Sequence, residues 1–485
     1  MPPTTAFDFG TALRLLARNA SNLPSAATAF DVMAATHANA AGIAELRALR
    51  LQQLLVAAQA TRFYSRALRG LDLDHVALSA LPVTGKPQLM RQFADRVTDP
   101  RVTLEGLQAL CADPQRIAEP YLGRYCVWES SGSTGQPGVF LQDEAAMAVY
   151  DALEALRRHP ARRLTRLFDP FYLGERFAFV GAIGGHFASH VSVRRLQRAN
   201  PWMAQHAQSF SILQSTVALV DGLNAFAPSI VATYPTAAVM LADEARSGRL
   251  RAFPQEVWTG GETLSGAMRR HIEETFGCTL SNSYGASEFL PIAWECAQQR
   301  LHLNADWVIL EAVDAQHRPV PAGHASHTTL LTNLANHVQP LIRFDIGDRI
   351  AFDTEPCTCG SALPTLQVQG RRDDALVERS RRGSPVTFLP LALTTLLEEE
   401  AGVFDFELRQ HGAGHWSLTL GPGAPHTRAV RERCRSLLVD FARLQGAADL
   451  RIVTHVAAAL PKGRSGKFKR IVAQDQEPVG PRAGT

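Results

Sequence analysis

A run of hydroxyl and glycine residues in the first third of the chain has the chemistry of a phosphate-binding loop. It consists of Ser130, Ser131, Gly132, Ser133, Thr134 and Gly135. Glycines let backbone N–H groups approach a polyphosphate closely, and the hydroxyl groups add further donors. The run lacks the Lys-Ser/Thr pair of a Walker-type P-loop, and strand-like residues flank it on both sides. A polar surface turn is the alternative interpretation of the run alone.

A second group, from Asn282 to Glu288, combines an aromatic residue, a glycine and a carboxylate. Tyr284 followed by Gly285 can pack against a flat ring, and Glu288 offers a hard oxygen ligand for Mg²⁺ beside phosphates. This group carries little weight by itself.

Asp348, Arg371 and Asp373 form a third group. A carboxylate that follows a strand can accept hydrogen bonds from both ribose hydroxyls. A neighbouring arginine can hold a ribose or phosphate oxygen. A cluster of surface ion pairs is the alternative for this group.

The fourth group is the basic segment 460–470, in which Gly463 and Gly466 flank a short loop before Lys467. Such a loop could carry one lysine into an active site. An ammonium group between a carboxylate and an α-phosphate would stabilise the charge that develops there. Taken alone, the segment has the composition of a solvated basic tail.

The order of these groups resembles the superfamily of acyl- and aryl-CoA ligases, adenylation domains and luciferases. A Gly-Gly-Glu segment, residues 260–262, completes six motifs in the order that this superfamily shows, over about residues 80–470. Within it, segments 81–86 and 295–307 resemble the phenylacetate-CoA ligase and coenzyme F390 synthetase branch.

The resemblance implies that ATP and Mg²⁺ activate a carboxylic acid as an acyl-adenylate, which is then transferred to CoA to give a thioester. It implies that Lys467 and Glu288 are catalytic, that Asp373 is a hinge, and that Glu288 binds magnesium. The residues that would bind ATP are Ser130, Ser131, Gly132, Ser133, Thr134, Gly135, Gly261, Glu262, Asn282, Tyr284, Asp348 and Arg371. The residues that would bind the acid are Tyr234, Gly260, Tyr284, Gly285 and Phe179.

Two departures from the superfamily pattern leave the acceptor open. Gln136 stands where many relatives carry lysine, and segment 375–384 poorly matches the Arg-Gly segment that opens a pantetheine channel. Adenylation is therefore better supported than transfer to CoA. The adenylate could instead pass to an amine or a carrier protein, or an adenylyl group could pass to a phenol. A rival of another class is a catalytically silent, zinc-binding interaction protein.

Four residues supply the ligands of a closed tetrahedral zinc site: Cys296, His302, Cys357 and Cys359. The alternative is that these are buried thiols beside a histidine. The resemblance favours the zinc site, because some members of the superfamily carry one. Cys111, Cys126, Cys278 and Cys434 are predicted to be lone buried thiols.

Aromatic residues alternate with glycines between Phe168 and Phe187. Such walls can form a slot for a flat ring, which predicts an aromatic acid as substrate. An ordinary pair of core strands explains the same pattern equally well.

Composition excludes several classes of protein. The chain has 485 residues, 46% hydrophobic and 20% charged, with a net charge of +3 and no concentrated basic patch, which argues against nucleic acid as a partner. No apolar run approaches the ~18 residues of a membrane span, and Asp8, Arg14 and Arg18 interrupt any signal peptide. We expect a cytoplasmic protein without membrane contact, and a homodimer is left open.

The patterning predicts an α/β fold with two domains. Residues 10–70 have helical spacing, 229–234 and 344–352 are strand-like, and 237–245 is helical. We predict a large N-terminal multi-sheet adenylation domain, residues 1–370, and a small mobile C-terminal α+β domain, residues 371–485, that carries the catalytic lysine. Within this domain, residues 385–485 are expected to hold two helices and two strands, at 404–408 and 415–420, and residues 474–485 are expected to be disordered.

Overall fold

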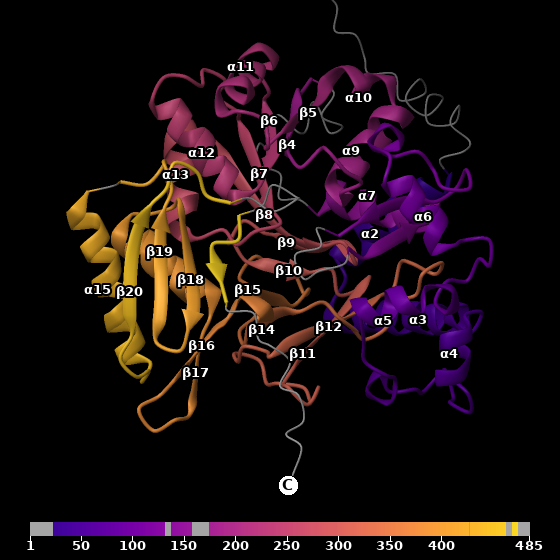
Figure 1. The fold of residues 1–485 in the computed structure, drawn as a ribbon. Helices are drawn as coiled ribbons and strands as arrows, with labels where there is room; N and C mark the ends of the chain where they lie inside the picture. The colour runs from indigo at the N-terminus through magenta and orange to yellow at the C-terminus, as the bar shows by residue number, and fades with distance from the viewer. Residues whose placement is uncertain (1–22, 131–136, 158–173, 426, 462–467, 474–485) are drawn as a thin grey trace, which may run out of the picture.

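The computed structural model describes residues 23–130, 137–157, 174–425, 427–461 and 468–473. Sheets covered by helices make up the larger part of the molecule, and a smaller sheet with its own helices lies beside it (Figure 1). The predicted α/β class is confirmed. None of the helices in these ranges combines the length and the apolar character that crossing a membrane requires.

A nine-stranded sheet forms the centre of the larger part. In spatial order its strands are β14 (Asp348–Phe352), β15 (Thr365–Arg371), β10 (Leu301–Leu303), β9 (Phe289–Glu295), β8 (Thr279–Ala286), β7 (Glu256–Gly260), β6 (Ile230–Thr233), β4 (Phe177–Gly181) and β5 (Ala207–Ser211). The strands from β5 to β8 run parallel, and those from β8 to β14 pair antiparallel. Parallel strands need helical crossovers, which α9 (Ala188–Ala199), α11 (Thr216–Phe226), α12 (Pro235–Arg246) and α13 (Gly266–Phe276) provide.

A second sheet and several helices pack beside this one. The sheet has four strands, β1 (Thr84–Gly85), β13 (Phe344–Asp345), β12 (Thr328–Asn333) and β11 (Val308–Val313). A separate hairpin joins β2 (Cys126–Glu129) to β3 (Val139–Gln142). The helices are α2 (Leu23–Thr36), α3 (Ala40–Ala58), α4 (Arg62–Ala67), α5 (Lys86–Arg91), α6 (Leu104–Cys111), α7 (Glu144–Leu156) and α10 (Pro201–His206). The predicted N-terminal helical region is confirmed from Leu23 onward.

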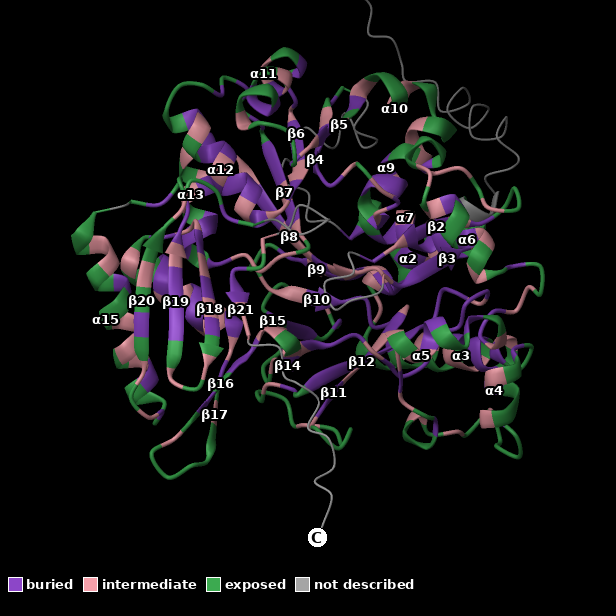
Figure 2. Ribbon diagram, in the orientation of Figure 1, coloured by how far each residue is buried: buried purple, intermediate pink, exposed green. Residues whose placement is uncertain are grey.

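The C-terminal part has a core of its own. Its sheet has the order β20 (Arg451–Val456), β19 (His415–Leu420), β18 (Phe406–Gly412), β21 (Ile471–Val472), and α15 (Arg428–Leu444) packs on it. The hairpin β16 (Leu376–Arg379)–β17 (Pro385–Phe388), helix α14 (Pro390–Thr395) and a turn of π-helix (Leu396–Glu400) complete it. Its cluster of buried residues extends from Leu376 to Ile471 and includes residues of β18 and β19, which Figure 2 colours as buried. This separate core agrees with a boundary near residue 370, and the mobility of this part stays a prediction.

Several local expectations are corrected. The stretch 344–352 forms two strands in different sheets, because Gly347 takes a φ of +75° and turns the chain between β13 and β14. Residues 385–485 hold three strands more than predicted, β17, β20 and β21, which are short or alternate poorly. Of the four isolated cysteines, Cys434 is buried, whereas Cys111, Cys126 and Cys278 are only partly buried.

A buried ion-pair network fastens the N-terminal helices to the sheets. Arg157, just after α7, donates two hydrogen bonds to the carboxylate of Asp306, at 2.6 and 2.8 Å, and neither side chain is exposed. Arg50 of α3 donates to the backbone oxygen of Asp306 at 2.7 Å, and its guanidinium lies 3.6 Å from the ring centroid of Trp307. The segment 301–307 therefore includes residues that hold the architecture together.

We expect Asp306→Asn to lower the free energy of unfolding by about 3–5 kcal/mol, because the buried Arg157 loses its counter-charge and Arg50 keeps only Asp31. The exposed pair Arg318–Asp314 provides the control, and Arg318→Gln should change stability by less than ~1 kcal/mol. Denaturant unfolding of the three proteins measures this difference. Equal stability of the Asp306 variant and the control would contradict the role of the network.

Candidate active site

A cavity of about 1250 Å³ lies between the larger part and the C-terminal part. One wall comes from the ends of β8, β14 and β15, including Tyr284, Asp348 and Arg371. The opposite wall includes Thr394 of α14 and the segment from Phe468 to Ile471. Figure 1 shows β14, β15 and the C-terminal sheet side by side where these walls meet. The volume is sufficient for a nucleotide together with a small acid.

Asp348, Tyr284 and Arg371 meet inside this cavity. The hydroxyl of Tyr284 donates to Asp348 Oδ2 at 2.7 Å, and both residues are buried. Arg371 is paired with Asp348 in the β14–β15 register, and its Nη1 lies 3.6 Å from Asp348 Oδ1. Burial, with the Asp348 carboxylate as a further cause, raises the pKa of Tyr284 well above its usual value, so this phenol stays a donor. A carboxylate oxygen can accept two hydrogen bonds, so each oxygen of Asp348 can still accept one from a ligand hydroxyl.

Backbone geometry explains the glycine after Tyr284. A Cβ atom at Gly285 would lie 1.9 Å from the carbonyl oxygen of Leu290, so no other residue fits without moving the backbone. The β8–β9 pairing also shifts register between Tyr284 and Ala286. The close approach of the two strands at Gly285 positions the Tyr284 ring beside Asp348.

Glu288 and Lys86 both line the cavity, and the charge of each affects the pKa of the other. Burial raises the pKa of Glu288, and the nearby Lys86 ammonium is the largest opposing influence. Burial likewise lowers the pKa of Lys86, and Glu288 opposes that shift. Lys86 begins α5, directly after β1, and lines the cavity. It was not among the expected site residues, although it lies in the 81–86 segment that carried the family resemblance.

The hydroxyl-rich run is described only at its first residue. Ser130 lines the cavity, donates its backbone N–H to the Gly138 carbonyl at 2.8 Å, and accepts the Gly138 N–H on Oγ at 2.8 Å. Ser131, Gly132, Ser133, Thr134 and Gly135 lie outside the described residues, as does Lys467. The antiparallel β2–β3 pair agrees with the expected strand–loop–strand setting. A Cβ at Gly138 would lie 3.2 Å from Lys86 Cγ, so Lys86 stands beside the end of this loop.

Three more expected ligands line the cavity: Gly261, Glu262 and Asn282. Asn282 donates its backbone N–H to Glu295 Oε2 at 2.9 Å and accepts on Oδ1 from the Thr259 hydroxyl at 3.0 Å. Asp373 also lines the cavity, in a single 3₁₀ turn (Arg372–Asp374) after β15. The structure brings these residues together with Tyr284 and Asp348.

The expected acid-binding residues are not all assembled. Tyr284 and Gly285 line the cavity, but Phe179, Tyr234 and Gly260 are not among its described lining residues. Phe179 is buried and stacks on His190 with ring centroids 6.4 Å apart. Tyr234 accepts the Ala182 N–H on its hydroxyl at 3.5 Å. Phe171 and Tyr172 of the predicted slot lie outside the described residues.

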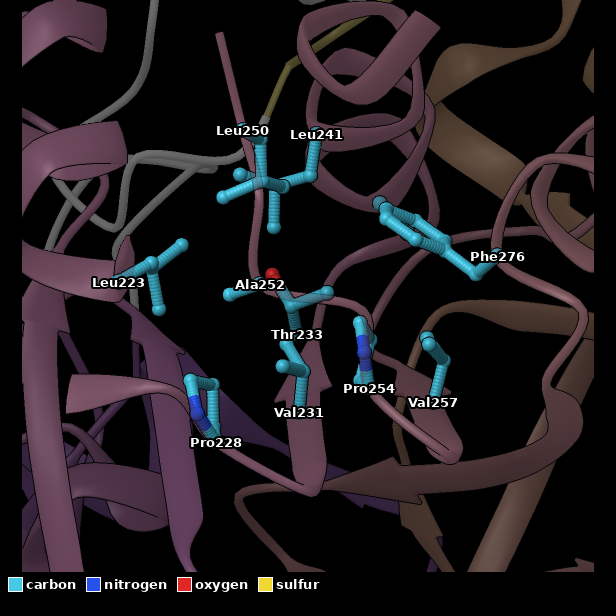
Figure 3. Close-up of a pocket in the computed structure, with 11 residues that line it drawn as sticks. Leu223, Pro228, Val231, Thr233, Leu241, Leu250, Ala252, Pro254, Val257 and Phe276 are labelled. Carbon is cyan, nitrogen blue, oxygen red and sulfur yellow. The ribbon is translucent and has the colours of Figure 1, made fainter. Parts of the chain in front are cut away.

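A smaller cavity lies among α11, α12 and strands β6 and β7 (Figure 3). Its volume is about 10 Å³, and Leu223, Leu241 and Phe276 are among its mostly apolar lining residues. The one hydroxyl in its lining, on Thr233, already donates to the Val180 carbonyl at 2.8 Å. The space is at the lower limit for one water and offers it no free polar partner, so it is a packing gap.

The predicted cysteine and histidine residues do gather at one point. The side-chain ligand atoms of Cys296, His302, Cys357 and Cys359 all lie within 4.8 Å of one another. Cys296 and Cys357 sulfurs are 3.6 Å apart, and Cys359 Sγ lies 3.3 Å from His302 Nε2. His302 Nδ1 donates to the Leu363 carbonyl at 2.9 Å, which leaves Nε2 free to bind a metal. Three thiols and one imidazole are a donor set that fits zinc.

No family model matches this chain. Individual known proteins do resemble it in sequence and in fold. The chain is 27% identical over 266 residues to a phenylacetate-coenzyme A ligase of Thermus thermophilus, covering 52% of this chain and 56% of that protein. It is 25% identical over 167 residues to the protein CapK of Staphylococcus aureus, covering 33% and 35%. The chain thus spans about half the length, or less, of these curated relatives.

Solved structures align over much more of the chain. A 2-hydroxyisobutyryl-CoA ligase in the postadenylation state, bound to an acyl-AMP, superposes with a TM-score of 0.63 at 18% identity, covering 88% of this chain and 89% of that one. An open conformation of that ligase, with acyl-AMP and CoA, gives 0.53 at 18% identity, over 88% and 90%. The chain has the fold of the adenylate-forming CoA ligases. The expected likeness to phenylacetate-CoA ligases is confirmed by the curated match.

We expect Lys86→Met to shift the acidic limb of the pH profile for adenylation to higher pH. The Lys86 cation lowers the pKa of Glu288, so its removal raises that pKa, and the carboxylate becomes protonated at a higher pH. Pyrophosphate exchange measured against pH tests this, with Arg91→Met as control because Arg91 is exposed at the other end of α5. An acidic limb that stays in place in the Lys86 variant would contradict the pairing.

Proposed function

We propose that this protein is an AMP-forming acid–CoA ligase that activates a carboxylic acid with ATP and Mg²⁺ and transfers the acyl group to CoA. The observation that carries the proposal is that Asp348, Tyr284, Arg371, Glu288 and Lys86 all line the same cavity. The fold and the partial match to a phenylacetate-CoA ligase support it.

In the first half-reaction, Asp348 would accept both ribose hydroxyls while Arg371 stays close to its carboxylate. Glu288 would hold Mg²⁺, which neutralises phosphate charge when it is bound. Lys86 and the 130–135 loop would bind the phosphates. An oxygen of the substrate carboxylate then attacks the α-phosphorus in line, the bond to the β-phosphate oxygen breaks, and pyrophosphate leaves. Lys467 would stabilise the charge between carboxylate and α-phosphate.

In the second half-reaction, the thiolate of CoA attacks the acyl carbon and AMP leaves. We propose that the C-terminal part first rotates about Asp373, which removes Lys467 and opens the site to the thiol. Gly370, with a φ of +105°, and the 3₁₀ turn of Arg372–Asp374 form a short connection between the two parts. The higher TM-score with the postadenylation structure than with the open one supports an arrangement of the two parts like that of the postadenylation state.

The proposed acid is aromatic. The phenylacetate in the name of the curated relative supports this choice. A cytoplasmic location and a homodimer stay predictions from the sequence.

We further propose that Cys296, His302, Cys357 and Cys359 bind a structural zinc ion. Four protein ligands complete a tetrahedron, so no position remains for a reacting water. The ion would join the end of β9 to the turn between β14 and β15, two segments about sixty residues apart. Beside Cys296, the Glu295 carboxylate accepts the Asn282 N–H, so the cluster also supports the strand that reaches the cavity.

The decisive assay is substrate-dependent pyrophosphate exchange over a panel of benzoates, phenylacetates, cinnamates and fatty acids. We expect exchange with an aromatic acid, and AMP release that rises when CoA is added. Lys467→Ala should lower exchange by about 10²-fold or more, whereas Lys462→Ala, in the same basic segment, should retain it. Exchange that is unaffected in the Lys467 variant, or AMP release that is indifferent to CoA, would contradict this assignment.

For the metal, we expect about one zinc per chain in untagged protein and close to none in Cys359→Ser. Thermal stability should fall more than the specific activity of the folded fraction, because the ion joins two distant segments. Cys278→Ser changes a partly buried cysteine outside the cluster and serves as control. Metal analysis by mass spectrometry decides the matter, and a stable, active, zinc-free wild type would exclude the site.

A further inference from the structure

The three residues that follow Lys467 contact three different parts of the chain. Phe468 donates its backbone N–H to Glu262 Oε1, in the larger part, at 3.2 Å. Lys469 Nζ lies 2.9 Å from Asp374 Oδ1, in the short connection between the parts. Arg470 pairs with the buried Glu398 of the C-terminal part. Of these three contacts, the one at Phe468 joins the C-terminal part directly to the larger part, one residue from the proposed catalytic lysine.

The other oxygen of Glu262 is fixed to the start of helix α12. Glu262 Oε2 accepts the Thr236 hydroxyl at 2.7 Å and the Thr236 backbone N–H at 3.3 Å. Tyr234, at the N-cap position of α12, makes no capping bond with its side chain. Glu262 therefore caps the helix from another segment, and the positive end of the helix favours its negative charge.

Glu262 therefore links the N-terminus of α12 to the Phe468 amide, and both oxygens of its carboxylate are fixed in position. Gly261, with a φ of +78°, turns the chain at the end of β7 so that Glu262 reaches both Thr236 and Phe468. A backbone N–H at hydrogen-bond distance tolerates little displacement, since a hydrogen bond weakens strongly beyond about 3.5 Å. A displacement of the C-terminal part by even a few ångströms would break the hydrogen bond between Phe468 and Glu262. The contact thus reports whether the segment after Lys467 is docked on the larger part.

A second contact between the parts has a different character. Arg270 of α13 and Glu399 of the π-helical turn form a 2.5 Å pair whose arginine side chain is 60% exposed. Solvent screens such a pair, and its expected contribution is small. Glu262 is only partly buried, but its partners include two backbone amides whose positions are set by helix α12 and by the C-terminal segment.

We propose that Glu262 is the positioning residue that sets the lysine-bearing segment in the adenylating arrangement, with Thr236 and the α12 N-terminus holding its carboxylate. The inference rests on the proposed function, because it concerns the first half-reaction of that chemistry. It adds a docking role to the nucleotide-site role that the sequence predicts for Glu262. No bond is made or broken at Glu262 itself, which acts only through the position of the Phe468 amide.

The kinetic test separates the half-reactions. Glu262→Gln should lower the rate of acyl-adenylate formation by about 10- to 100-fold, the size of effect expected when a catalytic group is displaced by about 1 Å. Thioester formation from supplied acyl-adenylate should stay within about twofold of wild type, because the docked contact is absent from that step. Glu399→Gln, at the exposed pair, should leave both rates nearly unchanged. Equal losses in both half-reactions of the Glu262 variant would overturn the proposal.

A pair of variants at Thr236 tests the positioning of the carboxylate. Thr236→Val removes the hydroxyl donor to Glu262 with little change in volume, whereas Thr236→Ser retains it. We expect Thr236→Val to slow adenylation by several-fold, with its KM for ATP close to wild type, and Thr236→Ser to behave as wild type. Equal rates for the valine and serine variants would show that the orientation of Glu262 does not matter.

Hydrogen–deuterium exchange gives a readout that needs no substrate acid. With α,β-methylene ATP and Mg²⁺ present, the peptide that contains Phe468 should exchange one amide more slowly in wild type and in Glu399→Gln than in Glu262→Gln. If the wild type lacks pyrophosphate exchange but shows this protection, the proposed function fails while the docking contact stands. If all three proteins exchange this amide equally fast, the docking proposal fails even for an active ligase.

Discussion

The carboxylate of Asp348 is the constraint on which the rest of the site depends. Asp348 begins β14 in the nine-stranded sheet, and its backbone oxygen accepts the Thr329 hydroxyl of β12, in the four-stranded sheet, at 2.8 Å. Its side chain accepts the Tyr284 hydroxyl from β8 and faces Arg371 of β15. One residue therefore relates two sheets, positions the aromatic residue of the cavity and leaves oxygens for a ligand. A buried carboxylate needs such partners, because an unpaired charge in the interior is costly.

Burial also distinguishes the contacts within the larger part from those that join it to the C-terminal part. The N-terminal helices are tied to the sheets by fully buried pairs around Asp306, which solvent cannot screen. The C-terminal part has its own core, and among the described residues its contacts with the larger part include the Phe468–Glu262 hydrogen bond and the exposed Arg270–Glu399 pair. Buried pairs resist rearrangement, whereas contacts of this second kind can be exchanged at small cost. This distribution suits an enzyme whose two half-reactions need different arrangements of one residue set.

Local patterns in the sequence predicted the fold class, and the family resemblance pointed to residues that line the cavity, among them Tyr284, Asp348 and Arg371. Gly285 is another such residue, and the packing that excludes a side chain there is between adjacent strands β8 and β9. The gathering of Cys296, His302, Cys357 and Cys359 was also predicted, from the ligand types together with the family resemblance. The strand expected over 344–352 was wrong because periodicity does not reveal that Gly347 passes the chain from one sheet to another.

Other features could not be inferred because they depend on distant contacts. Lys86 gives no sign of its role until the fold brings it beside Glu288, about two hundred residues later in the chain. Glu262 could be assigned to the cavity from its motif, but not to the N-terminus of α12 or to the Phe468 amide. The predicted acid-binding residues Phe179 and Tyr234 were chosen by composition, which cannot distinguish a substrate slot from a packed core.

The most direct measurement of the central claim is nucleotide binding by calorimetry, with ATP and 2′,3′-dideoxy-ATP compared in wild type and in Asp348→Asn. If Asp348 accepts the ribose hydroxyls, wild type should bind the dideoxy nucleotide at least about tenfold more weakly than ATP, since a charge-assisted hydrogen bond contributes about 1.5–3 kcal/mol. The Asp348 variant should discriminate much less between the two nucleotides. Equal affinity of the wild type for ATP and its dideoxy analogue would contradict the assignment of this cavity as the nucleotide site.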